Sequence, residues 1–170
     1  DAVVAGLADG SFKPADAKVG DSLVPERVWR EVSAANGSFE DARPNSYILV
    51  TVRSAEQRVM LLEASGHGMV YVNGEPRMGD PYRQGYSALP IVIRAGTNTL
   101  LFSVRGGLRA SLHQPTDGIA IVTRDVTLPD LCPSEETSSL IGVPLLNATN
   151  SQRAVMVRCE ARGVETLAGP

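Results

Sequence analysis

Residues 68–105 read GMVYVNGEPRMGDPYRQGYSALPIVIRAGTNTLLFSVR, and they contain the clearest fold signals of the chain. Three of its segments, MVYV, ALPIVIR and TLLFSVR, are rich in β-branched, aromatic and other apolar residues, a composition that favours strands. Asn73-Gly74 directly follows the first segment and is typical of a type I′ turn, in which both central residues have positive φ. We therefore expect three strands, connected first by this turn and a long loop and then by a Gly-Thr-Asn turn.

Alternation of apolar and polar residues predicts further strands on both sides of this stretch. Residues 28–34 alternate, residues 58–65 are apolar on both faces, and residues 119–128 are interpreted as a further strand. Residues 46–54 place three β-branched side chains on one face, namely Ile48, Val50 and Val52. We expect every one of these segments to contribute a strand to the same domain.

Glycines are expected to end strands at two sites, because glycine takes a positive φ without steric cost. The sequence GHG at 66–68 predicts a tight turn, and Gly106-Gly107 is expected to break the strand that precedes it. Residues 1–25 are punctuated by Gly, Pro and Asp, so we expect a loop there, with a short edge strand at Val3-Val4.

The fold class follows from the number and spacing of these segments. About eight short strands, separated by Gly, Pro and Asn turns, are typical of an all-β sandwich or barrel. No helical period of 3.6 residues is found across the first 128 residues. We expect an antiparallel β-sandwich of the jelly-roll kind, with a partial second β domain at its C-terminal side.

A change of composition at Pro129 predicts three parts. Residues 1–128 are expected to form the sandwich, residues 129–140 a Pro- and Ser-containing linker, and residues 141–170 two more strands. Two strands alone are marginally stable in water. Residues 141–170 are therefore interpreted either as a truncated second domain or as an extension of the first sheet.

Composition limits the partners. The chain has 170 residues and a net charge of −3, and its basic residues are scattered among acidic ones. Nucleic-acid binding needs clustered positive charge, so it is not expected. No apolar run approaches the roughly 20 residues that cross a bilayer. No signal peptide is recognised, and we expect a mature or trimmed product.

Cysteine and histidine usage indicates no cofactor. Cys132 and Cys159 are too few for a disulfide scaffold, and the sequence leaves open whether they pair. Neither His67 nor His113 has a neighbouring ligand at metal-binding spacing. No metal site is therefore predicted from spacing.

No catalytic machinery is recognised either. The chain has no Gly-x-Ser-x-Gly elbow for a serine nucleophile. Glycoside cleavage needs two carboxylates at one cleft, and nothing in their spacing singles out Glu63, Glu75 or Asp80. We therefore expect a non-catalytic domain.

The long loop at 76–86 is the best binding candidate. Sugar recognition needs a flat aromatic face together with planar hydrogen-bonding groups for the hydroxyls. The loop supplies both kinds of side chain, and the predicted ligand-binding residues are Arg77, Asp80, Tyr82, Arg83 and Tyr86. The alternative is that the loop packs on the chain's own sheet or on a neighbouring domain.

The pattern VYVNG, then a Gly/Tyr-rich loop, then LPIVIRAGTNTLLFSV resembles galactose-binding-like jelly-roll modules. The resemblance covers about residues 26–128, and Trp29 and Tyr47 also fit it. It implies a carbohydrate-binding or domain-packing module of an exported, extracellular or periplasmic multidomain protein. A structural calcium ion is common in such modules. The strands after Pro129 resemble the opening of an immunoglobulin-like domain.

Two functions from different classes follow. The first is an accessory module that binds carbohydrate or packs on a neighbouring domain of the same polypeptide. The alternative is the N-terminal part of a secreted hydrolase, a glycosidase, esterase or peptidase, whose active site lies beyond residue 170. A purely structural spacer or adhesion domain is a third interpretation.

Overall fold

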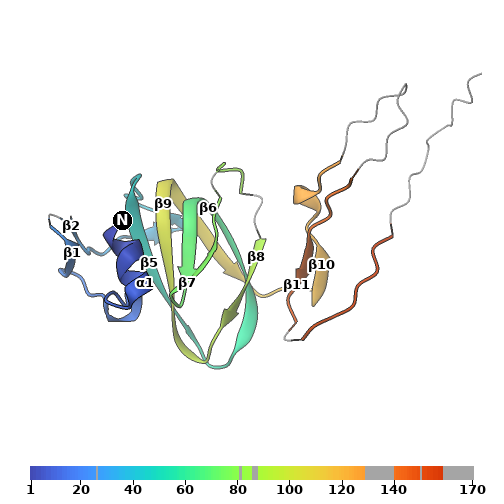
Figure 1. The fold of residues 1–170 in the computed structure, drawn as a ribbon, viewed down its shortest axis with the longest axis horizontal. Coiled ribbons are helices and arrows are strands. Elements are labelled where there is room, and N and C mark those ends of the chain that lie inside the picture. Colours follow the sequence, from blue (N-terminus) through green and yellow to red (C-terminus); the bar gives the residue numbers. More distant parts are fainter. Residues whose placement is uncertain (26, 81, 86–87, 129–139, 150, 159–170) are drawn as a thin grey trace, which may run out of the picture.

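The computed structural model describes residues 1–25, 27–80, 82–85, 88–128, 140–149 and 151–158. Strands make up about 48% of it and helices 9%, which confirms the all-β class. The largest assembly is an antiparallel sheet of seven strands that folds over on itself as a sandwich (Figure 1). These strands are β3 (Ala34–Ala35), β4 (Ser38–Phe39), β5 (Ser46–Ser54), β6 (Arg58–Val72), β7 (Glu75–Met78), β8 (Ala88–Ile93) and β9 (Gly96–His113).

The two longest strands, β6 and β9, form the centre of the sheet and run through both layers. They pair antiparallel from Val72↔Leu100 at one end to Leu61↔His113 at the other. The register shifts between Ser65 and Met69, where both strands bend. Because both strands continue through the bend, the two layers share their central strands and are joined by the continuous backbone of β6 and β9.

The bend lies at the glycines that were expected to end strands, and that expectation was wrong. Gly66 has φ 84°, and a Cβ on it would collide with the carbonyl oxygen of Gly107 on the facing strand. Gly107 also has a positive φ, of 60°. A positive φ is compatible with a turn and equally with a bulge inside a continuing strand, and here the facing glycines allow the close approach of a bulge.

Each layer also contains shorter strands, which pair with the halves of β6 and β9 that belong to that layer. In the first layer, β5 pairs with the first half of β9 and β7 with the second half of β6. In the second layer, β8 pairs with the first half of β6 and β4 with the second half of β9. Residues 75–78 were expected to begin an exposed loop, but they form strand β7. They pair with residues 69–72 of β6 directly after the Asn73-Gly74 turn, so the hairpin continues past that turn.

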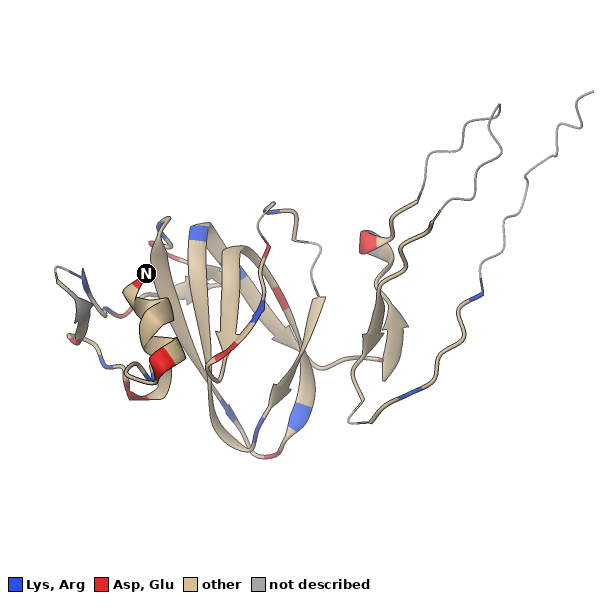
Figure 2. Cartoon of the chain, in the orientation of Figure 1, with Lys and Arg blue, Asp and Glu red and all other residues tan. Residues whose placement is uncertain are grey.

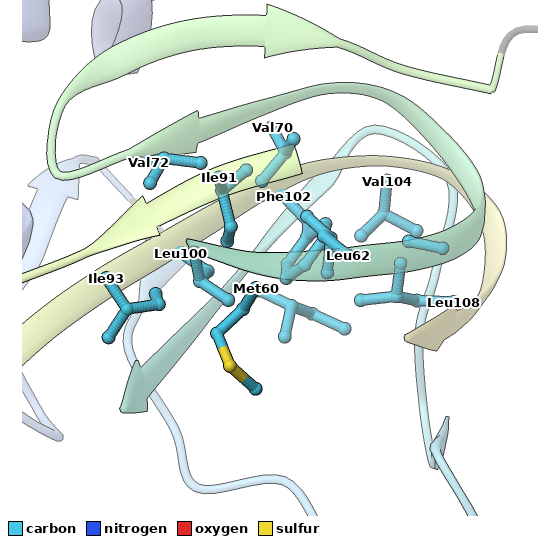
Figure 3. Close-up of a cluster of buried hydrophobic side chains, with 12 residues drawn as sticks. Met60, Leu62, Val70, Val72, Ile91, Ile93, Leu100, Phe102, Val104 and Leu108 are labelled. Carbon is cyan, nitrogen blue, oxygen red and sulfur yellow. The ribbon is translucent and has the colours of Figure 1, made fainter. Parts of the chain in front are cut away.

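The main core lies between the two layers (Figure 3). The predicted alternation is confirmed here, because Leu100, Phe102 and Val104 all point inward from β9. Met60 and Leu62 face them from the opposite layer. The remaining buried members of this core are Ile48, Ala64, Val70, Val72, Ile91, Ile93 and Leu108.

A second core covers the outer face of the first layer, and the N-terminal segment forms it. Tyr71 and Leu101 point outward from β6 and β9 and pack against Val3 and Phe12. Val3 belongs to helix α1 (Ala2–Asp9), so the expected edge strand at Val3-Val4 was wrong. The helix is short and Ala-rich, and its amphipathic side packs on the sheet, which stabilises it more than its intrinsic propensity does.

Helix α1 has clear signals at both ends. The side chain of Asp1 accepts a hydrogen bond from the Val3 amide at 2.9 Å, which caps the N-terminus. Gly10 ends the helix in the left-handed conformation, with φ 77°. Asp1 also accepts a hydrogen bond from the Tyr47 hydroxyl at 2.7 Å, so the cap fastens the helix to β5.

The segment between α1 and the sandwich differs from the prediction of a loop up to residue 25 followed by a strand at 28–34. After the 3-10 turn η1 (Pro14–Asp16), β1 (Ser22–Val24) and β2 (Arg27–Val28) form a separate two-stranded sheet. The predicted strand at 28–34 is therefore wrong for residues 29–33. Trp29 instead turns inward and stacks on Phe12, with ring centroids 6.1 Å apart.

A small sheet follows the sandwich. β10 (Ile119–Ile121) pairs antiparallel with β11 (Leu145–Asn147), and a 3-10 turn η2 (Thr123–Asp125) follows β10 (Figure 1). The two strands come from either side of the expected linker, most of which lies outside the described residues. The domain boundaries stay a prediction. Within the described part of the chain, no helix is long and apolar enough to span a membrane.

Candidate functional site

The predicted binding loop is divided by the structure into three environments. Arg77 lies on strand β7, where its guanidinium donates to Glu75 Oε2 at 2.8 Å. Glu75 also lies 3.7 Å from the guanidinium of Arg94. All three side chains are exposed, so this cluster is a solvated ion-pair network at the sheet edge, separate from the rest of the loop.

Asp80 is buried and organises the loop. Its carboxylate accepts hydrogen bonds from the backbone amides of Gln84 and Gly85, at 3.0 and 2.9 Å. Its own amide donates to the carbonyl oxygen of His67 at 2.9 Å. Asp80 therefore attaches the loop to the bend of β6, and both carboxylate oxygens already have hydrogen-bond partners.

The other predicted residues lie on the outside of this loop. Arg83 has a positive φ of 57°, and its guanidinium donates to the carbonyl oxygen of Arg105 at 2.7 Å. Tyr82 is 84% exposed. Tyr86 lies outside the described residues. Among the predicted residues that the structure describes, Tyr82 is thus the one whose side chain extends into solvent without a hydrogen bond or ion pair to another described residue.

His67 is the most deeply buried ionisable side chain near this loop. It is 2% exposed, its ring packs edge-on against Phe102 at 5.4 Å, and Nδ1 has no hydrogen-bond partner among the residues that the structure describes. Burial lowers the pKa of His67, although the charge of Asp80 acts in the opposite direction. The ring is therefore neutral near pH 7, and its place in the interior indicates a structural role.

A polar groove lies on the outer face of the second layer, where β6 and β9 pair. It has a volume of about 140 Å³ and is bordered by the β3–β4 turn on one side and by Gly85 on the other. Because alternate residues face outward, the two strands place polar side chains on its floor. Those side chains are Glu63, Ser65, Arg109 and Ser111.

Beside this groove a serine, a histidine and a carboxylate meet. Ser111 Oγ lies 2.8 Å from His113 Nε2, and Glu63 Oε2 lies 3.8 Å from the same nitrogen. A Ser-His-acid relay requires the carboxylate on the other ring nitrogen, so that one nitrogen can accept the serine proton. The geometry therefore supports a surface hydrogen-bond and ion-pair cluster and does not match a nucleophilic relay.

A larger pocket lies in the N-terminal segment. It has a volume of about 560 Å³, within the usual range for small-molecule sites, and the stacked Phe12 and Trp29 form part of its wall. Lys13, Asp16 and Asp21 add charged groups to the lining. Asp21 Oδ2 accepts from the Lys18 amide at 2.9 Å, which fixes the loop that carries it.

From the sequence, Trp29 was named only as part of the family resemblance, and residues 10–22 were assigned to a loop without a functional role. The stack of Trp29 on Phe12 joins residues from different loops, and only the tertiary fold brings them together. The sequence offered one weak signal for this pocket, namely the single tryptophan of the chain near a segment that contains Asp and Lys. That segment is hard to distinguish from an ordinary polar loop.

Among the described residues, no group of three or more His, Cys, Asp or Glu side chains could hold an ion. Cys132 and Cys159, whose pairing the sequence left open, lie outside these residues.

Comparisons with protein-family models, with curated proteins and with solved structures found no match to this chain. The protein belongs to the all-β class and forms an antiparallel β-sandwich with a second small sheet. Function must therefore be argued from the sites themselves.

Proposed function

We propose that this chain is a non-catalytic β-sandwich module that binds carbohydrate in the pocket beside Phe12 and Trp29. The observation that carries this proposal is the composition of that pocket, which combines a stacked aromatic pair with carboxylate and ammonium groups. The resemblance of residues 26–128 to galactose-binding-like modules points in the same direction. The proposed setting is an exported, extracellular or periplasmic multidomain protein.

The pocket has the chemistry that sugar recognition requires. One face of a pyranose ring carries C–H groups that pack on an aromatic surface, and its hydroxyls need planar or charged hydrogen-bonding partners. Trp29 is half-buried and held by its stack on Phe12, so little conformational entropy is lost when a ring packs against it. Lys13 and Asp16 are exposed at the same pocket and can donate to and accept from hydroxyls.

The outward loop provides a second, weaker surface for the same function. Tyr82 is the exposed aromatic of the loop, but Asp80 and Arg83 are engaged in holding the loop together. We therefore place the sugar site at Trp29 and treat the loop as the alternative location.

The experiment is affinity electrophoresis on gels that contain neutral polysaccharides, followed by titration calorimetry with the retarding sugar. We expect the wild-type chain to be retarded by at least one polysaccharide. Trp29→Ala should weaken binding by about 2 kcal/mol or more, roughly 30-fold, as truncation of a buried aromatic anchor does. Asp16→Asn should weaken it without affecting the Phe12–Trp29 stack.

Tyr82→Ala is the matched control, because it removes an exposed aromatic from the other surface. Loss of binding in Tyr82→Ala with no effect of Asp16→Asn would move the site to the loop. No retardation of the wild-type chain by any polysaccharide would contradict carbohydrate binding. Thermal unfolding of each variant separates lost binding from lost folding.

One observation favours domain packing as a second function. The small sheet and its flanking segments expose many large apolar side chains, including Leu128, Leu140 and Ile141 before β11 and Met156 after it. A two-stranded sheet buries little apolar surface by itself. Packing against a neighbouring domain of the same polypeptide, including the catalytic domain of a secreted hydrolase, would cover these residues.

A further inference from the structure

We infer that the polar groove between β6 and β9 is a second binding site, which takes a small carboxylate-bearing ligand on Arg109. The groove is distinct from the aromatic pocket, since the two share no lining residue. The inference is therefore independent of the proposed carbohydrate site.

Arg109 is the cation of this groove. Its side chain is exposed, and the structure assigns its guanidinium no hydrogen bond or ion pair with the described residues. Arg77 and Arg83, by contrast, already donate to a carboxylate and to a backbone carbonyl. A guanidinium presents two parallel N–H groups that match the two oxygens of a carboxylate. Arg109 thus offers the planar, bidentate contact that a carboxylate prefers.

The hydroxyl groups around Arg109 come from both central strands. Ser65 lies directly opposite Arg109 across the β6–β9 pair, and Ser111 lies two residues further along β9 on the same face. Ser111 Oγ is already oriented by His113 Nε2 at 2.8 Å. The groove can therefore hold hydroxyls next to the carboxylate, as in a hexuronic acid or a simple 2-hydroxy acid.

Hydrogen bonds hold both sides of the groove in place. On one side, the amide of Ala110 donates to the Gly37 carbonyl at 2.8 Å, which holds the β3–β4 turn against β9. On the other side, Asp80 fixes the amide of Gly85 at 2.9 Å. A preformed site loses less ordering entropy when a ligand binds.

Glu63 determines which anions fit. Its carboxylate lines the same groove and lies near His113, so a negative charge is already present on the floor. A dianion such as phosphate would be repelled by Glu63 more strongly than a monoanionic carboxylate. The volume of about 140 Å³ suits one small unit and excludes a longer chain from full burial.

The test is a titration of the whole chain followed by the backbone amide signals of Ser65, Gly85, Arg109 and Ser111 in NMR spectra. Galacturonate is compared with galactose, which has the same ring without the carboxylate. Glycolate tests whether the carboxylate and one hydroxyl suffice, and inorganic phosphate tests charge alone. We expect saturable shifts of these signals with galacturonate. The affinity for galactose should be at least roughly 10-fold weaker.

Arg109→Gln should weaken galacturonate binding by roughly 10-fold or more, because it removes the charge-assisted contact. Arg53→Gln is the matched control, since Arg53 is an exposed arginine on β5 in the other layer and should leave binding unchanged. Binding of glycolate as tight as that of galacturonate would identify a hydroxy acid as the ligand class and keep the carboxylate site. Equal binding of galactose or of phosphate, no saturable shift with galacturonate or glycolate, or an unchanged Arg109→Gln variant would overturn the inference.

Discussion

Asn73 and Asn98 join two turns that are distant in the sequence. The side-chain amide of Asn73 donates to Asn98 Oδ1 at 2.9 Å, and Asn73 Oδ1 accepts from the Thr99 amide at 2.9 Å. Asn98 is 0% exposed, and it also bonds both the amide and the carbonyl of Arg94. The β6–β7 turn and the β8–β9 turn are thus held together by one buried amide pair.

Replacement of Asn98 should destabilise the sandwich strongly. Asn98→Ala removes the partner of the Arg94 amide and of the Asn73 side-chain NH2 group, at a position where the Asn98 side chain is fully buried. Such unsatisfied groups cost about 1–3 kcal/mol each, so we expect a loss of roughly 3 kcal/mol in the free energy of unfolding. Urea unfolding measures it. Thr97→Ala, an exposed neighbour, serves as the control, and a loss below about 0.5 kcal/mol for Asn98→Ala would contradict this role.

The contact between Gly66 and Gly107 predicts a difference between two glycine substitutions. Gly66→Ala meets both an unfavourable φ and the Gly107 carbonyl, whereas Gly10→Ala has a similar φ and open space around it. We expect Gly10→Ala to lower the free energy of unfolding by about 1 kcal/mol. Gly66→Ala should lower it further, by about 1–3 kcal/mol more, because the added methyl group overpacks the bend. Thermal unfolding of the two variants measures the difference. Equal losses would show that the bend tolerates a side chain.

Burial of His67 predicts a pH dependence of stability. The folded-state pKa of His67 is lowered below the ordinary value near 6.5, so the folded state favours the neutral ring. The stabilisation is therefore fully present above about pH 6.5. It is lost as the pH falls toward the lowered pKa, with a slope of at most about 1.4 kcal/mol per pH unit.

Urea unfolding between pH 5 and 8 tests this dependence (about one proton is involved). His67→Phe should flatten the curve in that window. The chain has two histidines, so His113→Gln is the natural control and should retain the slope. A wild-type curve that is flat between pH 5 and 7 would show that His67 is not excluded from protonation.

Asp80 predicts that the loop depends on one carboxylate. Asp80→Ala removes the acceptor for the Gln84 and Gly85 amides, and hydrogen bonds to a charged group contribute about 1.5–3 kcal/mol. We expect these two amides to lose hydrogen-exchange protection first. Tyr82→Ala, in the same loop but exposed, should change stability by less than about 0.5 kcal/mol. Unchanged exchange at Gln84 and Gly85 in Asp80→Ala would mean that other contacts hold the loop.

The charges of the chain follow the pattern that the sequence indicated. Figure 2 shows acidic and basic residues interspersed over the sandwich. The charged pairs in the structure, such as Arg77 with Glu75, are exposed. Such pairs contribute little to stability, so the fold depends on its two apolar cores.

Local patterns in the sequence were enough to predict the strand class, the faces of the long strands and the Asn73-Gly74 turn. Leu100, Phe102 and Val104 alternate with outward residues, and the period of two residues assigns them to one face without any knowledge of the partner strand. Asn73-Gly74 forms the predicted turn with φ of 51° and 86°, because a type I′ turn depends on only those two residues.

The continuation of these strands and the contacts between polar residues depend on the three-dimensional fold. Gly66 and Gly107 permit a turn or a bulge equally, and the facing strand selects the bulge. From the sequence, Asp80 resembles an exposed acidic residue of a loop. In the folded chain it is buried, because the backbone amides of its own loop surround its carboxylate. Ser65 and Arg109 become neighbours through the register of β6 on β9. Register depends on contacts between residues distant in the chain, and local patterns carry little information about them.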